Sequence, residues 1–141
     1  PEELKSLNAR LVHEMPYESV AERLLGLGIR PTREFWETVR GNCETVADAC
    51  EYWQVVSGPV QGRIEDDDRE FVTRARDLLP DGDITDESWG AWTSALKAET
   101  GRKGRALFMP LRRVLTGMDH GPDMKALLPL IGRRNILDRL P

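Results

Sequence analysis

The stretch of this sequence with the clearest chemical character is residues 102–113, which hold five basic side chains and no acidic ones. They are Arg102, Lys103, Arg105, Arg112 and Arg113. Gly101 and Gly104 flank the first two and leave backbone amides open to close approach. Guanidinium groups stack on unpaired bases, hydrogen-bond to base edges and neutralise phosphates, so the segment predicts binding of single-stranded RNA. The same arginines could instead pair with acidic side chains of the protein, and the residues alone leave both readings open.

The net charge of −4 conceals an asymmetry along the chain. Residues 1–99 contain 11 Lys and Arg against 21 Asp and Glu, whereas residues 100–141 contain 9 against 3. An acidic body with a basic end is expected of a protein that presents one surface to a polyanion. Chance segregation of charge is the alternative.

Other chemistries find little support. The sequence has no glycine-rich phosphate loop, no nucleophile elbow and no paired-histidine zinc motif. Its two cysteines, Cys43 and Cys50, and two histidines, His13 and His120, do not cluster, so no metal or cofactor is expected in this chain. The acidic run at residues 65–68 is interpreted as the first turn of a helix, with a metal-holding loop as the alternative.

The elements that must position these residues are helical. Apolar residues recur every three or four positions, and no run alternates apolar with polar residues. We therefore predict an all-α fold of about nine to ten short helices. Thr32 is expected to cap one helix, and Pro110 to kink or split the long segment 102–116. Leu107, Phe108 and Leu111 are expected to form the core face of that segment. Gly121 and Pro122 are expected to begin another helix.

Residues 57–62 are the strongest break in the first half of the chain, a turn-rich linker. We place a domain boundary just after it. The first domain is predicted to span residues 1–64, and the second, which carries the basic segment, residues 65–141.

Residues 100–117, TGRKGRALFMPLRRVLTG, closely resemble the signature of the anticodon-binding region of bacterial glutamyl-tRNA synthetases, class I aminoacyl-tRNA synthetases. The continuations His120-Gly121-Pro122 and LLPLIG at residues 127–132 fit the same family. Looser likeness extends to residues 7–10, 39–42 and 46–49. The resemblance implies two packed helical subdomains, a helix bundle followed by a helix cage, that grip the anticodon loop of the tRNA for glutamate.

The resemblance also assigns roles to single residues. Arg112 aligns with the helix arginine that reads an anticodon base. Gly121, Pro122 and Met124 fall where the family packs against splayed bases, and Arg40 falls where its first subdomain approaches the first anticodon base.

On chemical grounds Lys103 and Arg105, with Gly104 between them, are assigned to phosphates. The competing structural readings are Pro122 as a helix start and Arg113 as a surface ion pair.

The family further implies that a catalytic region lies before residue 1. That region would bind ATP and magnesium and attach glutamate to its tRNA, while this chain binds no cofactor and is itself non-catalytic. The absence of an initiator Met suggests a piece of a longer protein.

The predicted partner is the tRNA for glutamate, and whether glutamine tRNA is also bound stays open. We expect a cytoplasmic protein that does not bind a membrane, because no apolar run approaches membrane length and the acidic start lacks the features of a signal peptide. We also expect a monomer that does not bind DNA. The alternative function is a helical protein–protein adaptor with a basic C-terminal face, for which a contact surface could come from the tryptophans Trp36, Trp53, Trp89 and Trp92.

Overall fold

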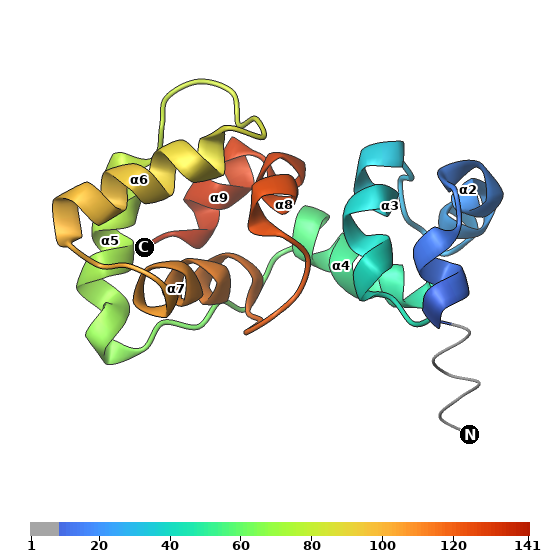
Figure 1. Cartoon of the computed structure of the whole chain (residues 1–141), viewed down its shortest axis with the longest axis horizontal. Helices are drawn as coiled ribbons and strands as arrows, with labels where there is room; N and C mark the ends of the chain where they lie inside the picture. Colours follow the sequence, from blue (N-terminus) through green and yellow to red (C-terminus); the bar gives the residue numbers. More distant parts are fainter. Residues whose placement is uncertain (1–8) are drawn as a thin grey trace. The chain divides into compact units, whose positions relative to one another are not determined.

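The computed structural model describes residues 9–141, which fold into two compact units (Figure 1). The first ends at Gly58 and the second begins at Pro59, so the boundary falls inside the predicted linker at residues 57–62. Within the described residues the chain forms α-helices and three short 3-10 helices and no β-strand, which confirms the all-α prediction. The assignment of residues 1–64 and 65–141 as two anticodon-binding subdomains stays a prediction.

The first unit packs short helices around two large aromatic side chains. Residues 9–14 are helical and precede α2 (Tyr17–Gly26), α3 (Arg33–Val39) and α4 (Ala49–Ser57), with 3-10 turns at Arg40–Asn42 and Val46–Asp48. Phe35 and Trp36 lie in the core, at 1% and 0% exposure. Thr32 caps α3 as predicted, since its hydroxyl accepts a hydrogen bond from the Phe35 amide at 3.1 Å.

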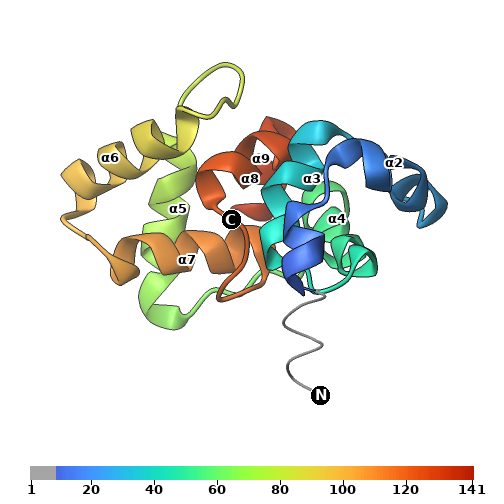
Figure 2. The ribbon, with the colours of Figure 1, turned by 45° about the vertical axis from the view of Figure 1, so that its right-hand side comes forward.

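The second unit contains the basic segment. After a 3-10 turn at Asp66–Asp68 come α5 (Arg69–Leu78), α6 (Ser88–Thr100), α7 (Arg105–Thr116), α8 (Met124–Ile131) and α9 (Arg133–Arg139). Helix α5 contacts both α6 and α7, which lie toward opposite ends of it in Figures 1 and 2. The core is apolar, and its largest fully buried side chains are Trp92, Leu96, Leu111, Leu115, Leu127, Leu128 and Ile136.

Helix α7 is not split at Pro110, because one helix runs from Arg105 to Thr116 and contains the proline. A kink at Pro110 stays a prediction. A proline inside a helix has no N–H to donate to the carbonyl four residues earlier, here that of Ala106. The guanidinium of Arg102 takes this place, since its Nη1 donates to the Ala106 oxygen at 3.0 Å. The carbonyl that Pro110 leaves without a backbone donor is thus satisfied by a side chain, and the helix continues.

The start of α8 corrects another prediction. The helix begins at Met124 rather than at Gly121 or Pro122. Asp123 is its N-cap and accepts a hydrogen bond from the Lys125 amide at 3.2 Å. The Gly-Pro pair instead ends the loop that joins α7 to α8.

The tryptophans do not form the exposed cluster that an adaptor would require. Trp36 and Trp92 have no exposed surface, and their indole N–H groups donate to the carbonyls of Met15 and Ala75, at 2.7 and 2.8 Å. Trp53 and Trp89 are partly covered. Nothing in the described part of the chain favours the adaptor alternative.

Two further findings concern residues 9–141 only. Their helices are too short or too polar to cross a membrane. They contain no group of three or more His, Cys, Asp or Glu side chains placed to hold a metal ion.

Candidate nucleic-acid interface

Helix α7 has one buried and one exposed face. Leu107, Leu111, Val114 and Leu115 are buried, at most 2% exposed. The opposite face carries Arg105, Phe108, Met109 and Arg112, spaced as successive turns of a helix require. Arg105 and Arg112 are seven residues apart and therefore lie on one face, about 10 Å apart along the axis. Basic groups at both ends of an apolar strip that contains an aromatic ring, Phe108, form a surface suited to a single-stranded nucleic acid.

Phe108 was expected in the core face with Leu107 and Leu111, and this expectation is wrong. Its side chain is 44% exposed. Its ring lies 6.0 Å from that of Trp89 on α6, with an angle of 34° between the ring planes. A large aromatic side chain held open to solvent on a neighbouring ring is available for stacking.

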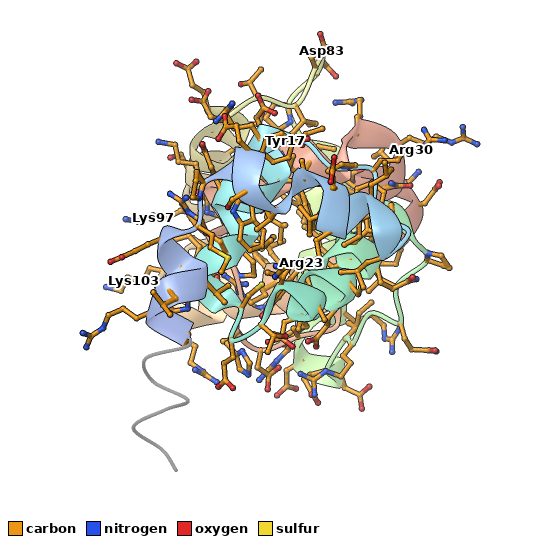
Figure 3. All side chains as sticks on the ribbon, turned by 90° about the vertical axis from the view of Figure 1, so that its right-hand side faces the viewer. Tyr17, Arg23, Arg30, Asp83, Lys97 and Lys103 are labelled. Carbon is orange, nitrogen blue, oxygen red and sulfur yellow. The ribbon has the colours of Figure 1, made fainter. Side chains whose placement is uncertain are left out.

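The amino-terminal end of α7 is open. Gly101 and Gly104 have φ values of 75° and 60°, and a Cβ on either would meet no atom within 4 Å. Lys103 and Arg105 are exposed and form no salt bridge in the described structure. Figure 3 labels Lys103 at the surface of the molecule. The predicted phosphate contacts Lys103, Gly104 and Arg105 are therefore accessible together.

Arg102, by contrast, uses its side chain in contacts within the protein. It donates to the carboxylate of Asp68 at 2.8 Å and to the carbonyls of Ala106 and Asp67, both at 3.0 Å. Its guanidinium also lies over the ring of Phe71, 4.4 Å from the centroid. For this arginine the alternative reading holds: it pairs with the acidic part of the protein.

The middle of α7, from Phe108 to Arg112, borders a pocket of about 260 Å³. Its lining residues are Trp89, Phe108, Met109, Arg112, Asp123 and Met124. Two of the predicted base-contacting residues, Arg112 and Met124, are thus brought together. A third, Pro122, is joined to them because its carbonyl accepts a hydrogen bond from Arg112 Nη2 at 3.0 Å. Gly121, with φ 148°, precedes Pro122 in the same loop.

Two opposing effects act on the pKa of Arg112. Burial lowers the pKa of Arg112, and the nearby carboxylate of Asp123 acts in the opposite direction. Because an arginine ordinarily titrates far above neutral pH, the group remains a cation under working conditions. Partial burial strengthens any hydrogen bond that this cation donates to a ligand.

The loop that carries Gly121 and Pro122 is held to α7 by ion pairs of Asp119. Asp119 accepts a hydrogen bond from Arg113 Nε at 2.9 Å and also pairs with Arg63. The Arg63 amide donates to the Arg113 carbonyl at 3.0 Å. These contacts confirm Arg113 as a surface ion pair. The Arg113 guanidinium, with help from Arg63, lowers the pKa of Asp119.

Two glycines make this fastening possible. A Cβ on Gly62 would lie 2.4 Å from the Val114 carbonyl oxygen, and one on Gly117 would lie 2.7 Å from that of Gln61. Gly117 also has φ 73°, as the residue that ends α7. The segment just after Pro59 therefore lies directly against the end of α7, with no room for a side chain at Gly62 or Gly117.

Arg40 lies in the first unit, whereas the other seven predicted residues lie in the second. Its Nη1 donates to the Met15 carbonyl at 3.1 Å, an oxygen that also accepts from Trp36. Arg40 thus has a structural contact of its own, and its role at the first anticodon base stays a prediction.

A larger hollow of about 580 Å³ lies over α5 and the end of α6. Asp67, Glu70, Asp77 and Glu99 line it, and its two arginines, Arg74 and Arg102, already pair with acidic side chains. Its negative charge makes it a poor site for RNA.

Sequence reasoning missed four residues of the smaller pocket: Trp89, Phe108, Met109 and Asp123. The helical spacing of Phe108 and Met109 between Arg105 and Arg112 was visible and could have placed an apolar strip on the basic face. Nothing in the sequence places Trp89, nineteen residues before Phe108, beside it.

An all-helical unit that holds an arginine and an aromatic shelf around one pocket, with free basic groups beyond it, has the features of a module that binds unpaired nucleotides. The family model described as "Anticodon binding domain" matches residues 17–141. The chain belongs to this family of tRNA-binding domains.

Individual relatives are similar over nearly the whole chain. Glutamate–tRNA ligase 2 of Hyphomonas neptunium is 55% identical over 139 residues, and that of Methylorubrum populi is 54% identical over 142. Glutamate–tRNA ligase 1 of Bartonella quintana is 45% identical over 141. These matches cover 98–99% of this chain but only 31% of each relative.

Proposed function

We propose that this chain is the anticodon-reading part of a glutamate–tRNA ligase. The observation that carries the proposal is the exposed face of α7, where Arg112 and Phe108 border a pocket and Arg105 extends the basic surface. Membership of the anticodon-binding domain family and relatives named glutamate–tRNA ligase support the same assignment.

In this proposal the residues divide the work by chemistry. Arg112, held at the pocket by the Pro122 carbonyl, donates hydrogen bonds to the edge of one unpaired anticodon base. Met124 and Pro122 form the wall against which the base packs. Lys103 and Arg105, with the open backbone at Gly104, neutralise backbone phosphates and fix the position of the loop.

The proposal extends to the parent protein. That protein attaches glutamate to its tRNA in translation with ATP and magnesium, which its catalytic region binds, and it acts as a monomer. Its RNA partner is the tRNA for glutamate, and Arg40 contributes to the recognition of the first anticodon base.

The test is binding of the 141-residue chain to a glutamate tRNA transcript and to transcripts with single anticodon changes, across a series of salt concentrations. The native anticodon should bind tightest, and affinity should fall as salt rises because counterions are displaced. Arg112→Ala should lower affinity for the native anticodon by roughly 5- to 150-fold and relax the preference at one position.

Arg69→Ala is the matched control, since Arg69 is exposed at the start of α5 beside Asp66 and away from the pocket. It removes the same charge and should leave the anticodon preference intact. Equal binding of all transcripts by the unaltered chain would refute the proposal.

A further inference from the structure

The pocket beside Arg112 contains a hydrogen-bond acceptor as well as a donor. Asp123 lines it together with Arg112 and the Trp89–Phe108 ring pair. A pocket built to hold a phosphate would not carry a carboxylate, because the two negative charges repel. A flat, neutral group with both donors and acceptors on its edge fits this lining, and a nucleobase is such a group.

Both polar groups are fixed before any ligand arrives. Asp123 is the N-cap of α8, where its Oδ1 accepts from the Lys125 amide at 3.2 Å. Arg112 donates from Nη2 to the carbonyl of Pro122, the residue just before Asp123. A carboxylate offers about four lone-pair positions and a guanidinium five N–H donors, so each keeps capacity for a ligand. Their spacing is therefore set by one loop and one helix.

The chemistry of base edges indicates what Asp123 accepts. The exocyclic amino group of cytosine, adenine or guanine lies at the rim of the base and points its hydrogens outward. Uracil has a single ring N–H between two carbonyl oxygens, so a carboxylate that approaches it also meets a carbonyl oxygen. A carboxylate at the end of a pocket therefore favours an amino-bearing base.

We propose that Asp123 is a specificity-determining residue that accepts a hydrogen bond from the exocyclic amino group of one unpaired anticodon base. Arg112 donates to the acceptor beside that amino group, and the base lies on the exposed ring of Phe108. The inference rests on the proposed function and adds to it an acceptor and a stacking shelf.

The experiment measures binding of the 141-residue chain to hairpins with the anticodon stem and loop of a glutamate tRNA. Each amino-bearing anticodon base is replaced in turn by its analogue without the amino group: pyrimidin-2-one for cytosine, purine for adenine and inosine for guanosine. The variant is Asp123→Ser, because serine keeps the N-cap of α8 and is too short to reach the base.

At one anticodon position, removal of the amino group should weaken binding by the unaltered chain roughly tenfold. The Asp123→Ser variant should show no such loss at that position, and its affinity for the unmodified hairpin should already be reduced. The control Asp83→Ser removes an equal charge from the exposed loop before α6, where Figure 3 labels this residue. It should behave as the unaltered chain.

Phe108→Ala should weaken binding of every hairpin by a similar factor, roughly 5- to 150-fold, since stacking does not depend on base identity. Phe108→Tyr should retain most of the affinity. If amino removal costs the unaltered chain and Asp123→Ser the same at every position, the role of Asp123 is wrong while the proposed function stands. If the unaltered chain binds all anticodon sequences equally, both fail.

Discussion

The two ends of α7 carry similar residues in opposite surroundings. At the amino-terminal end, Lys103, Gly104 and Arg105 are exposed, with open space at the glycine. At the carboxy-terminal end, Arg112 is hydrogen-bonded to the Pro122 carbonyl, and the loop below it is fastened through Asp119. A phosphate can be neutralised by a mobile charge, but a base edge is read only by groups held in place. The difference separates the two tasks along one helix.

Each end also contains an arginine that is not available to a ligand. Arg102 pairs with Asp68 at the first end, and Arg113 pairs with Asp119 at the second. The five basic residues of one segment thus divide into structural and accessible groups. The two groups are divided by their partners, which are Asp68, 34 residues from Arg102, and Asp119, six residues from Arg113.

The largest expected effect is on stability and distinguishes Gly101 from Gly117. Gly101 and Gly117 have nearly the same backbone conformation, with φ 75° and 73°, but only Gly117 faces a backbone oxygen at 2.7 Å from its would-be Cβ. Gly101→Ala should lower the free energy of unfolding by about 1 kcal/mol, from the left-handed conformation alone. Gly117→Ala should lower it by about 3 kcal/mol or more, because the Gln61 backbone must also move. Urea denaturation measures both, and equal losses would contradict the close approach.

Arg102 and Arg105 provide the next comparison. Arg102→Ala removes hydrogen bonds to Asp68, Asp67 and Ala106 and should destabilise the chain by about 2 kcal/mol. Arg105→Ala should change stability by no more than about 0.5 kcal/mol, as expected for an exposed side chain without an ion pair. Thermal or urea unfolding checks this. A loss at Arg105 as large as that at Arg102 would show that Arg105 has a structural role as Arg102 does, and that the structural and accessible groups are not divided as described.

A smaller effect concerns RNA affinity at the open end. Lys103→Ala and Arg105→Ala should each weaken binding of all anticodon hairpins alike, without altering base preference. Each should also reduce the slope of log affinity against log salt by about 0.7, the value for one phosphate contact on a single strand. Binding titrations at several salt concentrations measure the slope. A change of base preference with either variant would indicate that the bases are recognised at this end of the helix, and would contradict the assignment of Lys103 and Arg105 to phosphates.

The smallest expected effect is a pH dependence at the fastened end. Because Arg113 lowers the pKa of Asp119 in the folded state, this carboxylate stabilises the chain above its unfolded pKa of about 4. The contribution should disappear as pH falls through the lower, folded value. The difference in melting temperature between the unaltered chain and Asp119→Asn should therefore shrink from pH 6 toward pH 3. Asp83→Asn, which alters an exposed residue without an ion pair in the described structure, is measured at the same pH values as the matched control.

Much of the helical fold could be predicted from local sequence. Thr32 and the apolar spacing place α3, because capping and amphipathic burial depend on residues a few positions apart. The course of α7 through Pro110 could not be predicted, since the donor that replaces the missing N–H is Arg102, which lies outside the helix. The exposure of Phe108 was missed for a similar reason. An aromatic residue next to a leucine is expected in the core unless the tertiary structure provides another ring to support it.

The sequence by itself determined the helical class, the break between the two units and the basic segment with its family resemblance. These features depend on composition, on short-range periodicity and on a contiguous motif. Only the tertiary structure decided which arginines are available, and it did so through Asp68 and Asp119. It also brought Trp89 and Asp123 together with Arg112 around one pocket. The physical reason is that the pocket, and the ion pair of Arg102 with Asp68, depend on distances between residues far apart in the chain, which folding alone sets.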